Sequence, residues 1–231
     1  MLTAIIAAAG SSRRVGFDKL FAMIAGKPVI AHSIDAFERV DSVSEIIVVA
    51  REERHREVKK IIDRENFKKV RSIIPGGEYR QDSVRAGLDR VKADAKYVAV
   101  HDAARPLITA GQIERVFEQC RMHGATALAE PINDTIKRAD VELAVAGSLA
   151  RDQLYAMQTP QIFERGLIEE AYRAVCAENV SVTDEVSAVE RLGRKVVLVP
   201  NEDINFKITY QRDLPLAEFV LKHRMHCSGE F

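Results

Sequence analysis

Small residues followed by two cations are the first feature of this sequence that could do chemistry. Ala8, Ala9 and Gly10 come directly after a short apolar run, and Arg14 and Lys19 follow soon afterwards. Small side chains let backbone N–H groups approach a phosphate, whose charge Arg and Lys can neutralise. The segment lacks the glycine spacing of Walker and dinucleotide-binding loops, which argues against kinase and dehydrogenase chemistry. We therefore expect a phosphate-binding turn here, with a solvated basic turn as the alternative.

A second turn of this kind follows another apolar run. Gly76 and Gly77 precede Ser83, which stands at the start of a helical pattern. Glycines and a hydroxyl between a strand and a helix again suit the close approach of a phosphate. The alternative is a plain glycine turn, with Asp82 or Ser83 as the N-cap of the helix. The pattern alone leaves both interpretations open.

An acidic residue ends a third apolar run. Asp102 lies in the segment His101-Asp102-Ala103-Ala104-Arg105-Pro106. At the carboxyl end of a parallel strand, a carboxylate can hold Mg²⁺ against a triphosphate. The alternative is a turn in which Asp102 pairs with Arg105. We expect His101 to be a packed or hydrogen-bonded imidazole rather than a base.

Strand-length apolar runs alternate with helical patterns and predict the elements that position these residues. The runs are nearly continuous, which is typical of parallel strands covered by helices on both faces, so we expect a doubly wound α/β sheet. Ligands in such sheets bind beyond the carboxyl ends of the strands. The predicted strands are 3–8, 45–50, 70–74, 97–101, 125–130 and 196–200, and the predicted helices are 29–39, 54–65, 81–91, 111–123, 164–178 and 184–192.

The alternation breaks between Ile132 and Gln158. Short strands over 134–138, 142–146 and 154–157 predict a β-arm inserted at about 132–157 into a single domain of residues 1–231. A two-stranded arm is marginal alone in water, so we expect it to rest on its own domain or on a second subunit. Further along the chain, a short strand over 205–209 and a final helix over 213–223 are predicted.

Composition excludes several function classes. The 231 residues are 47% hydrophobic, enough for a core that needs no disulfide or metal, which excludes disorder as the dominant state. Lys plus Arg and Asp plus Glu both number 34, and aromatic residues make up 6%, which disfavours a nucleic-acid binder. No apolar run is long enough to span a membrane. The three cysteines include no CxxC pair, so we expect a reducing, cytoplasmic environment.

Seven motifs together resemble those of 2-C-methyl-D-erythritol 4-phosphate cytidylyltransferases, over Thr3 to about Phe219. This resemblance implies a mostly parallel, Rossmann-like nucleotidyltransferase sheet and the transfer of a cytidylyl group from CTP to 2-C-methyl-D-erythritol 4-phosphate, with Mg²⁺. The products would be 4-diphosphocytidyl-2-C-methyl-D-erythritol and pyrophosphate, in non-mevalonate isoprenoid biosynthesis. The motifs, in chain order, are Ala8-Ala9-Gly10, Gly76-Gly77 with Arg80 and Ser83, 101–106, 134–137, 158–161, 183–185 and 206–209.

The resemblance also implies a role for each matching residue. Thr135 and Arg151 match arm residues that reach a neighbouring subunit's active site, so a homodimer formed through the arm is expected. Catalytic roles fall to Arg14, Lys19 and Lys207; nucleotide binding to Ala8, Ala9, Gly10, Gly77, Arg80 and Ser83; substrate binding to Arg105, Thr135, Arg151, Thr159 and Thr183; and metal binding to Asp102.

One departure from the family pattern affects Lys19. The usual Pro-Lys-Gln ending of the first loop reads Asp18-Lys19-Leu20 here, so the register of Lys19 differs from the common pattern. Two alternative functions are open: a cytidylyltransferase for another polyol phosphate such as ribitol 5-phosphate, and a non-catalytic nucleotide-binding module. Turnover with a panel of polyol phosphates would separate the alternatives.

Overall fold

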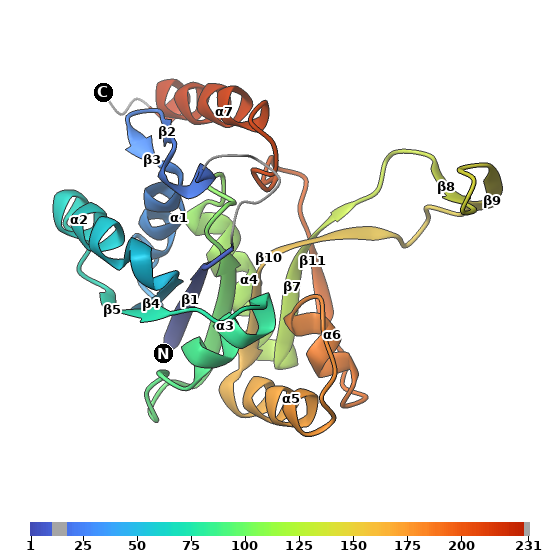
Figure 1. Ribbon diagram of the computed structural model, residues 1–231, viewed down its shortest axis with the longest axis horizontal. Helices are drawn as coiled ribbons and strands as arrows, with labels where there is room; N and C mark the ends of the chain where they lie inside the picture. Colours follow the sequence, from blue (N-terminus) through green and yellow to red (C-terminus); the bar gives the residue numbers. More distant parts are fainter. Residues whose placement is uncertain (11–17, 229–231) are drawn as a thin grey trace.

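A seven-stranded sheet forms the centre of the molecule, as a computed structural model of residues 1–10 and 18–228 shows (Figure 1). The strand order is β11-β7-β10-β6-β1-β4-β5, and every neighbouring pair is parallel except the two that involve β10. The predicted mostly parallel, doubly wound sheet is confirmed. Its strands are β1 (Leu2–Ala8), β4 (Val43–Ala50), β5 (Val70–Pro75), β6 (Tyr97–Asp102), β7 (Ala125–Pro131), β10 (Tyr155–Glu164) and β11 (Val197–Pro200).

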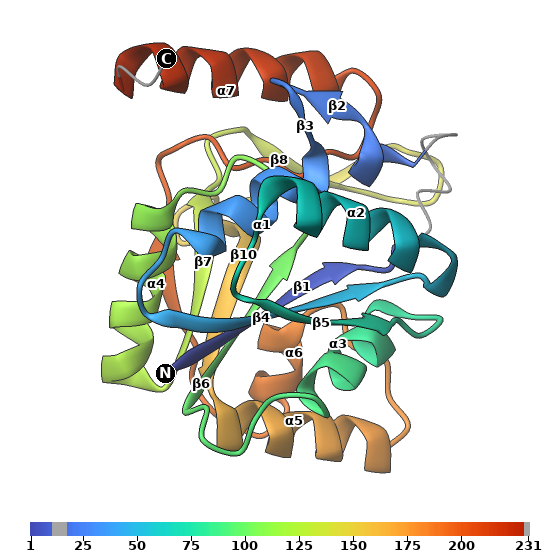
Figure 2. The same ribbon diagram turned by 90° about the vertical axis from the view of Figure 1, so that its left-hand side faces the viewer.

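Helices cover both faces of this sheet (Figure 2). Successive strand residues point to opposite faces, so Ile6 packs into the core under one set of helices and Ile5 into the core under the other. This two-sided burial explains the continuous apolar runs of the strands. One face carries α1 (Val29–Glu38), α2 (His55–Glu65) and α4 (Ala110–His123), and the other carries α3 (Arg80–Leu88), α5 (Arg165–Ala177) and α6 (Glu185–Glu190).

The start of α3 differs from the alternative considered for the second glycine turn. Tyr79 is the N-cap residue, and the carboxylate of Asp82 accepts a hydrogen bond from the Tyr79 backbone N–H at 3.1 Å. Asp82 therefore occupies the third helical position of a capping box. The alternative with Asp82 or Ser83 as the N-cap is wrong, because the helix begins at Arg80, one residue earlier than predicted.

The arm consists of β8 (Ile136–Ala139) and β9 (Val145–Leu149), which pair antiparallel and project away from the sheet (Figure 1). The arm strand predicted over 142–146 is shifted, since β9 begins at Val145, and the assignment of 154–157 to the arm is wrong. Residues 142–144 turn between β8 and β9, and Tyr155 begins β10 by pairing with Pro131 of β7. Residues 155–157 thus belong to the central sheet, and the arm ends earlier than predicted.

The C-terminal part also differs from the prediction. Residues 205–209 form no strand, and the final helix α7 (Asp213–Ser228) extends past the predicted end at His223. The structure adds elements that were not predicted, namely the short strands β2 (Met23–Ile24) and β3 (Lys27–Pro28) and the 3₁₀ turns η1 (Lys19–Phe21) and η2 (Glu52–Arg54). Within residues 1–10 and 18–228, no helix combines the length and apolar character needed to cross a membrane.

Candidate active site

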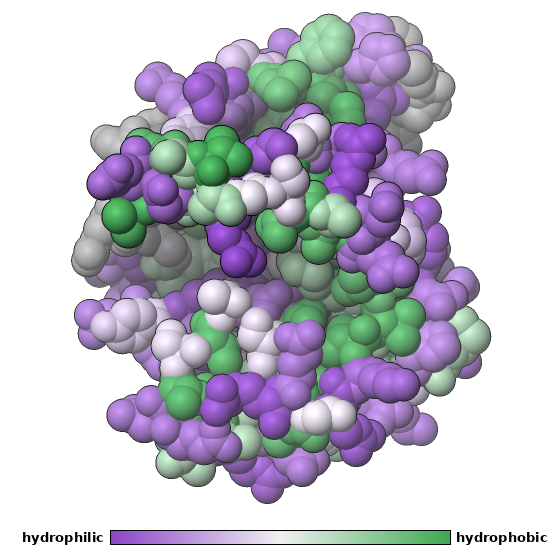
Figure 3. Space-filling model, turned by 90° about the vertical axis from the view of Figure 1, so that its right-hand side faces the viewer, coloured by the Kyte–Doolittle hydropathy of each residue, from purple (hydrophilic) through white to green (hydrophobic). Residues whose placement is uncertain are grey.

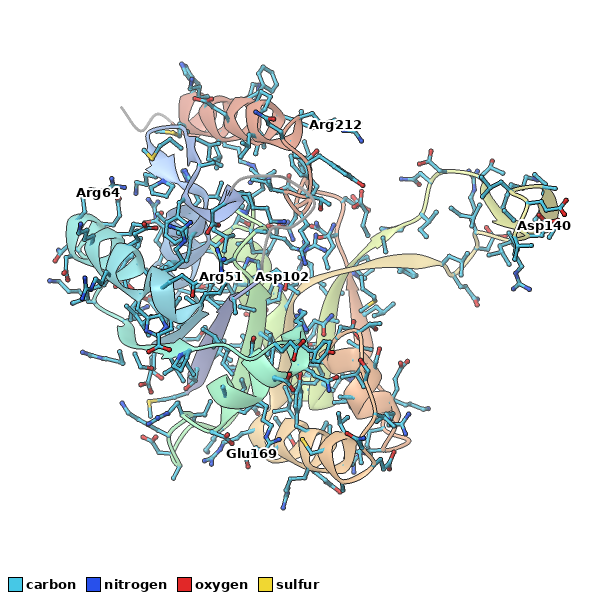
Figure 4. All side chains as sticks on the ribbon, viewed as in Figure 1. Arg51, Arg64, Asp102, Asp140, Glu169 and Arg212 are labelled. Atoms are coloured by element: carbon cyan, nitrogen blue, oxygen red, sulfur yellow. The ribbon has the colours of Figure 1, made fainter. Side chains whose placement is uncertain are left out.

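The carboxyl ends of β1, β5 and β6 bring the predicted site segments to one edge of the sheet. The backbone N–H of Ala103 donates to the Ala7 carbonyl at 3.1 Å, and the N–H of Gly76 donates to the Ala50 carbonyl at 3.0 Å. The turns that follow these strands are therefore neighbours. Figure 4 shows Asp102 near the middle of the molecule, far from Asp140 on the arm.

Asp102 is a nearly buried carboxylate held by two cations. Lys207 Nζ donates to Asp102 Oδ2 at 2.6 Å, and Arg80 Nε donates to Oδ1 at 3.2 Å. The backbone N–H of Asp102 donates to the Thr159 hydroxyl at 3.1 Å. The turn considered as the alternative is also present, because the backbone N–H of Arg105 donates to the Asp102 carbonyl at 2.9 Å, while the side chain of Asp102 is held by Lys207 and Arg80.

These cations determine the protonation state of Asp102. Burial alone would raise the pKa of the carboxyl, but the charges of Arg80 and Lys207 and the hydrogen bond from Lys207 lower it well below its ordinary value. Asp102 is therefore ionised at neutral pH. An ionised carboxylate at a strand end is the form that binds a divalent cation.

His101 is a neutral structural residue, as expected. It is fully buried, with Nε2 in contact with the Arg105 carbonyl at 3.2 Å and Nδ1 with the Thr159 hydroxyl at 3.0 Å. Burial lowers the pKa of His101 to about 4. Both ring nitrogens are already engaged, so this imidazole has no position from which to accept a substrate proton.

The two glycine turns pack against each other. A Cβ atom added at Gly76 would lie 2.2 Å from Ala9 Cβ, so the turns approach too closely for any side chain at this position. The backbone N–H of Gly77 donates to Ser83 Oγ at 3.1 Å. The structure thus brings Ala8, Ala9, Gly77 and Ser83 together at one end of the sheet, where a nucleotide would meet small side chains and backbone.

The segment from Asn205 to Thr209 crosses this end of the sheet and is held by site residues. Lys19 Nζ donates to the Ile208 carbonyl at 2.5 Å, and the N–H of Ile208 donates to the Ala104 carbonyl at 2.8 Å. The backbone of 205–209 therefore bonds to side chains and turns instead of to a neighbouring strand, and the strand predicted there is absent. These contacts also bring Lys19 and Lys207 to the same region.

Arg14, the other predicted catalytic cation, lies outside the described residues. So does every residue from Ser11 to Phe17, which leaves Gly10 as the last described residue of the first loop. The predicted roles of Gly10 and Arg14 stay predictions. On the other side of this gap, Asp18 accepts a hydrogen bond from Arg51 at 2.5 Å and pairs with Arg54 at 3.0 Å.

Three of the five predicted substrate-binding residues lie on the main body of the molecule: Arg105, Thr159 and Thr183. Arg105 is mostly buried and donates from Nη1 and Nη2 to the carbonyls of Asn205 and Met157, at 2.8 and 3.1 Å. Thr159 is buried against Asp102, as described above. Thr183 is exposed at the entrance to α6. The contacts of Arg105 thus order the backbone around the site.

Thr135 and Arg151 lie on or beside the arm, apart from the rest of the site. Both are exposed, and Arg151 donates to the Asn133 carbonyl, which ties the two sides of the arm together. The arm projects outward in Figure 1, so one chain does not bring these residues to its own Asp102. Any role in a partner's site stays a prediction.

Two site residues were not predicted. Glu185 is fully buried and forms a bidentate ion pair with Arg80, and Tyr172 donates its hydroxyl to the same carboxylate at 2.9 Å. Glu185 belongs to a quoted motif, 183–185, so the motif offered a signal for it. Tyr172 gave none, because an aromatic residue on a helix usually indicates core packing.

Asp102 is the candidate metal-binding carboxylate at this edge of the sheet. Among the described residues, no three His, Cys, Asp or Glu side chains gather in a cluster that could hold a metal ion. Mg²⁺ often binds through one or two carboxylates together with substrate phosphates and water. Each oxygen of Asp102 accepts one hydrogen bond and keeps a second lone pair, so this donor set fits Mg²⁺ bound jointly with a triphosphate.

Fold and site together define an α/β nucleotide-binding protein of the nucleotidyltransferase class. The family model for 2-C-methyl-D-erythritol 4-phosphate cytidylyltransferase matches residues 2–223. Curated proteins with this name from Dehalococcoides mccartyi and Pelotomaculum thermopropionicum are each 39% identical to the chain, with 95% and 96% of the chain and 95% of each relative covered. The chain belongs to the 2-C-methyl-D-erythritol 4-phosphate cytidylyltransferase family.

A solved structure agrees with this assignment. The 4-diphosphocytidyl-2C-methyl-D-erythritol synthase of Anaerococcus prevotii superposes with a TM-score of 0.85 at 31% sequence identity, covering 96% of this chain and 98% of that one. The resemblance expected from the seven motifs is therefore confirmed at the level of family and fold.

Proposed function

We propose that this protein transfers the cytidylyl group of CTP to 2-C-methyl-D-erythritol 4-phosphate, giving 4-diphosphocytidyl-2-C-methyl-D-erythritol and pyrophosphate in isoprenoid biosynthesis. Family membership supports this reaction. The observation that carries it is the cluster of Asp102, Arg80, Lys207 and Lys19 beside the glycine turns. Such a cluster suits two polyanions that must be brought together.

The reaction needs no general base. A phosphate oxygen of methylerythritol phosphate attacks the α-phosphorus of CTP; a new P–O bond forms as the bond to pyrophosphate breaks. A phosphate monoester is already anionic near neutral pH, so no proton has to be removed from the nucleophile. This agrees with the buried, neutral state of His101 and with a site built from cations.

The chain's own groups orient the substrates and stabilise added charge. Lys19 and Lys207 belong to segments fixed by backbone hydrogen bonds, so their ammonium groups are positioned before the substrates arrive. We assign the ordered turns at Gly77 and Ser83 to the cytidine. Preorganised donors of this kind lower the barrier because they need no rearrangement during the reaction.

Asp102 is the residue we assign to Mg²⁺. When bound, this ion would neutralise part of the triphosphate charge and polarise its phosphoryl oxygens. The low pKa of Asp102 and the spare lone pairs on its oxygens support the assignment.

We further propose a cytoplasmic homodimer that forms through the arm. Val141, Leu143 and Val145 are 98%, 86% and 68% exposed near the tip of the arm, and Figure 3 looks at the molecule from the side toward which the arm projects. A two-fold dimer would bury these side chains self-complementarily. Free Cys120 and Cys176 agree with a reducing compartment. The arm would then carry Thr135 and Arg151 to the partner's site.

Subunit exchange tests the shared site. Arg151→Ala chains and Lys19→Ala chains, each inactive alone, should regain partial activity when mixed, because a heterodimer holds one intact site and one doubly damaged site. The control mixes each variant with itself under the same conditions. Persistent inactivity after verified exchange would contradict the shared site.

A pyrophosphate-release assay tests the reaction itself. With CTP, we expect methylerythritol phosphate to be turned over in preference to ribitol 5-phosphate, and turnover to require Mg²⁺. Faster turnover of ribitol 5-phosphate would support the other polyol assignment. CTP binding without release from any polyol phosphate would support a binding module.

A further inference from the structure

Glu185 is the most completely buried carboxylate beside the site. It has no exposed surface and is the first residue of α6. Its Oε1 accepts hydrogen bonds from Arg80 Nη1 at 2.5 Å and from the Tyr172 hydroxyl at 2.9 Å, and its Oε2 accepts one from Arg80 Nη2 at 2.9 Å. A buried charge is tolerated only when it is paired and hydrogen-bonded, as Glu185 is.

The ion pair with Glu185 fixes the orientation of the Arg80 guanidinium. Each Nη atom donates to one oxygen of Glu185, and Nε donates to Asp102 Oδ1 at 3.2 Å. The end-on fork of an arginine, made by one N–H of each Nη atom, can hold only one carboxylate in bidentate fashion at a time. In this orientation Arg80 donates one hydrogen bond to Asp102, through Nε.

This orientation matters because Asp102 is the alternative partner for the fork. If Glu185 lost its charge, the bidentate pair with Asp102 would become the stronger arrangement for the guanidinium. Asp102 already accepts a hydrogen bond from Lys207 at 2.6 Å. A bidentate pair with Arg80, added to this hydrogen bond, would occupy the lone pairs of Asp102 that a metal ion requires.

We propose that Glu185 is a positioning residue for the transfer reaction: it holds the fork of Arg80 and so keeps Asp102 available to Mg²⁺ and the CTP triphosphate. The inference rests on the proposed function and extends it to a residue that contacts neither substrate. Glu185, at the start of α6, would thus influence metal binding through its ion pair with Arg80.

Tyr172 offers a matched control. It donates to the same carboxylate and is almost buried, but it holds no part of the fork. Tyr172→Phe should lower the melting temperature while Arg80 stays bidentate to Glu185. A merely structural role for Glu185 would make Glu185→Gln and Tyr172→Phe behave alike.

The experiment compares wild type, Glu185→Gln, Glu185→Asp and Tyr172→Phe. It measures the Mg²⁺ concentration that gives half-maximal pyrophosphate release, CTP binding by calorimetry with and without Mg²⁺, and the melting temperature. For Glu185→Gln we expect the half-saturating Mg²⁺ concentration to rise about tenfold or more. Its Mg²⁺-dependent gain in CTP affinity should shrink similarly, while CTP binding without Mg²⁺ changes less than threefold. Tyr172→Phe should shift the Mg²⁺ requirement less than threefold.

A Glu185→Gln enzyme with the Mg²⁺ requirement of Tyr172→Phe would overturn the proposal, as would Mg²⁺-independent CTP binding in the wild type. If Glu185→Gln does not fold, Glu185→Asp carries the test: the shorter side chain draws the fork back and should raise the Mg²⁺ requirement severalfold, and an unchanged value overturns the proposal. Calorimetry keeps the two proposals distinguishable, because it reports on Glu185 even if no polyol phosphate is turned over.

Discussion

Gly76→Ala tests whether contact between the two glycine turns builds the nucleotide site. The new Cβ would lie 2.2 Å from Ala9 Cβ and 2.8 Å from Ser83 Oγ. Carbon atoms in contact sit about 3.5–4.0 Å apart, so the turns must separate by about 1.5 Å. Ala9 has no rotatable side chain, and the N–H of Gly76 is bonded to the Ala50 carbonyl, so the backbone itself must move.

The expected cost follows from this geometry. Overpacking typically costs about 1–3 kcal/mol, and the clash with Ala9 Cβ, which cannot rotate away, places Gly76→Ala near about 3 kcal/mol. For a chain of this size, that lowers the melting temperature by about 6–12 °C. A displacement of about 1 Å at the turns should also reduce turnover by about 10²-fold.

Calorimetric CTP titration, thermal melting and pyrophosphate release measure these effects. Gly111→Ala is the matched control, because Gly111 lies in α4 and an added Cβ would meet no atom within 4 Å beyond its chain neighbours and its own helix backbone. That variant should melt at or above the wild-type temperature, since Ala favours helix more than Gly does. If Gly76→Ala matched Gly111→Ala in stability and in CTP affinity, the turns would not form the site as described.

Three further outcomes are expected. Lys19→Ala should lower turnover by about 10²-fold, because a preorganised cation contributes about 3 kcal/mol to the transition state; the lost hydrogen bond to the Ile208 carbonyl should cost only about 1 kcal/mol of stability, and retained activity would place the catalytic cation elsewhere, such as at Arg14. Asp102→Asn should raise the Mg²⁺ requirement more than it lowers stability; a wild-type Mg²⁺ titration with a melting temperature several degrees lower would make Asp102 a structural residue. Burial raises the pKa of the Cys120 thiol to about 12, so at pH 8 iodoacetamide should modify exposed Cys176 and leave Cys120 as the neutral thiol; peptide mapping that finds Cys120 modified in the folded protein would contradict this.

Much of the fold was predictable because strands that are buried on both faces have nearly continuous apolar sequences. The continuous apolar residues of β1 and β4 indicated a doubly wound sheet, and the structure has it. Residues 155–157 were misassigned because a strand that returns antiparallel from an inserted arm has the same local pattern as the arm itself. Only its pairing with β7 distinguishes the two.

The site was predictable to the extent that it lies at strand ends. Asp102 ends β6 and Gly77 follows β5, and these strands run in the same direction, so their carboxyl ends share an edge of the sheet. The pairing of Arg80 with Glu185 spans 105 positions in sequence and depends on the tertiary placement of the first residues of α3 and α6, which no local pattern records. The segment 205–209 shows the same limit, since contacts from Lys19 and Arg105 override its strand-like pattern.

The most direct test of the central claim follows the α-phosphorus of CTP. With CTP labelled at that position, methylerythritol phosphate and Mg²⁺, the label should appear in the diphosphocytidyl product, and the released pyrophosphate should carry none. The Lys207→Ala enzyme should form this product at a rate at least about 10²-fold lower, because it loses a preorganised cation beside Asp102. Label that remains in CTP, or that is released as cytidine monophosphate, would contradict cytidylyl transfer by this protein.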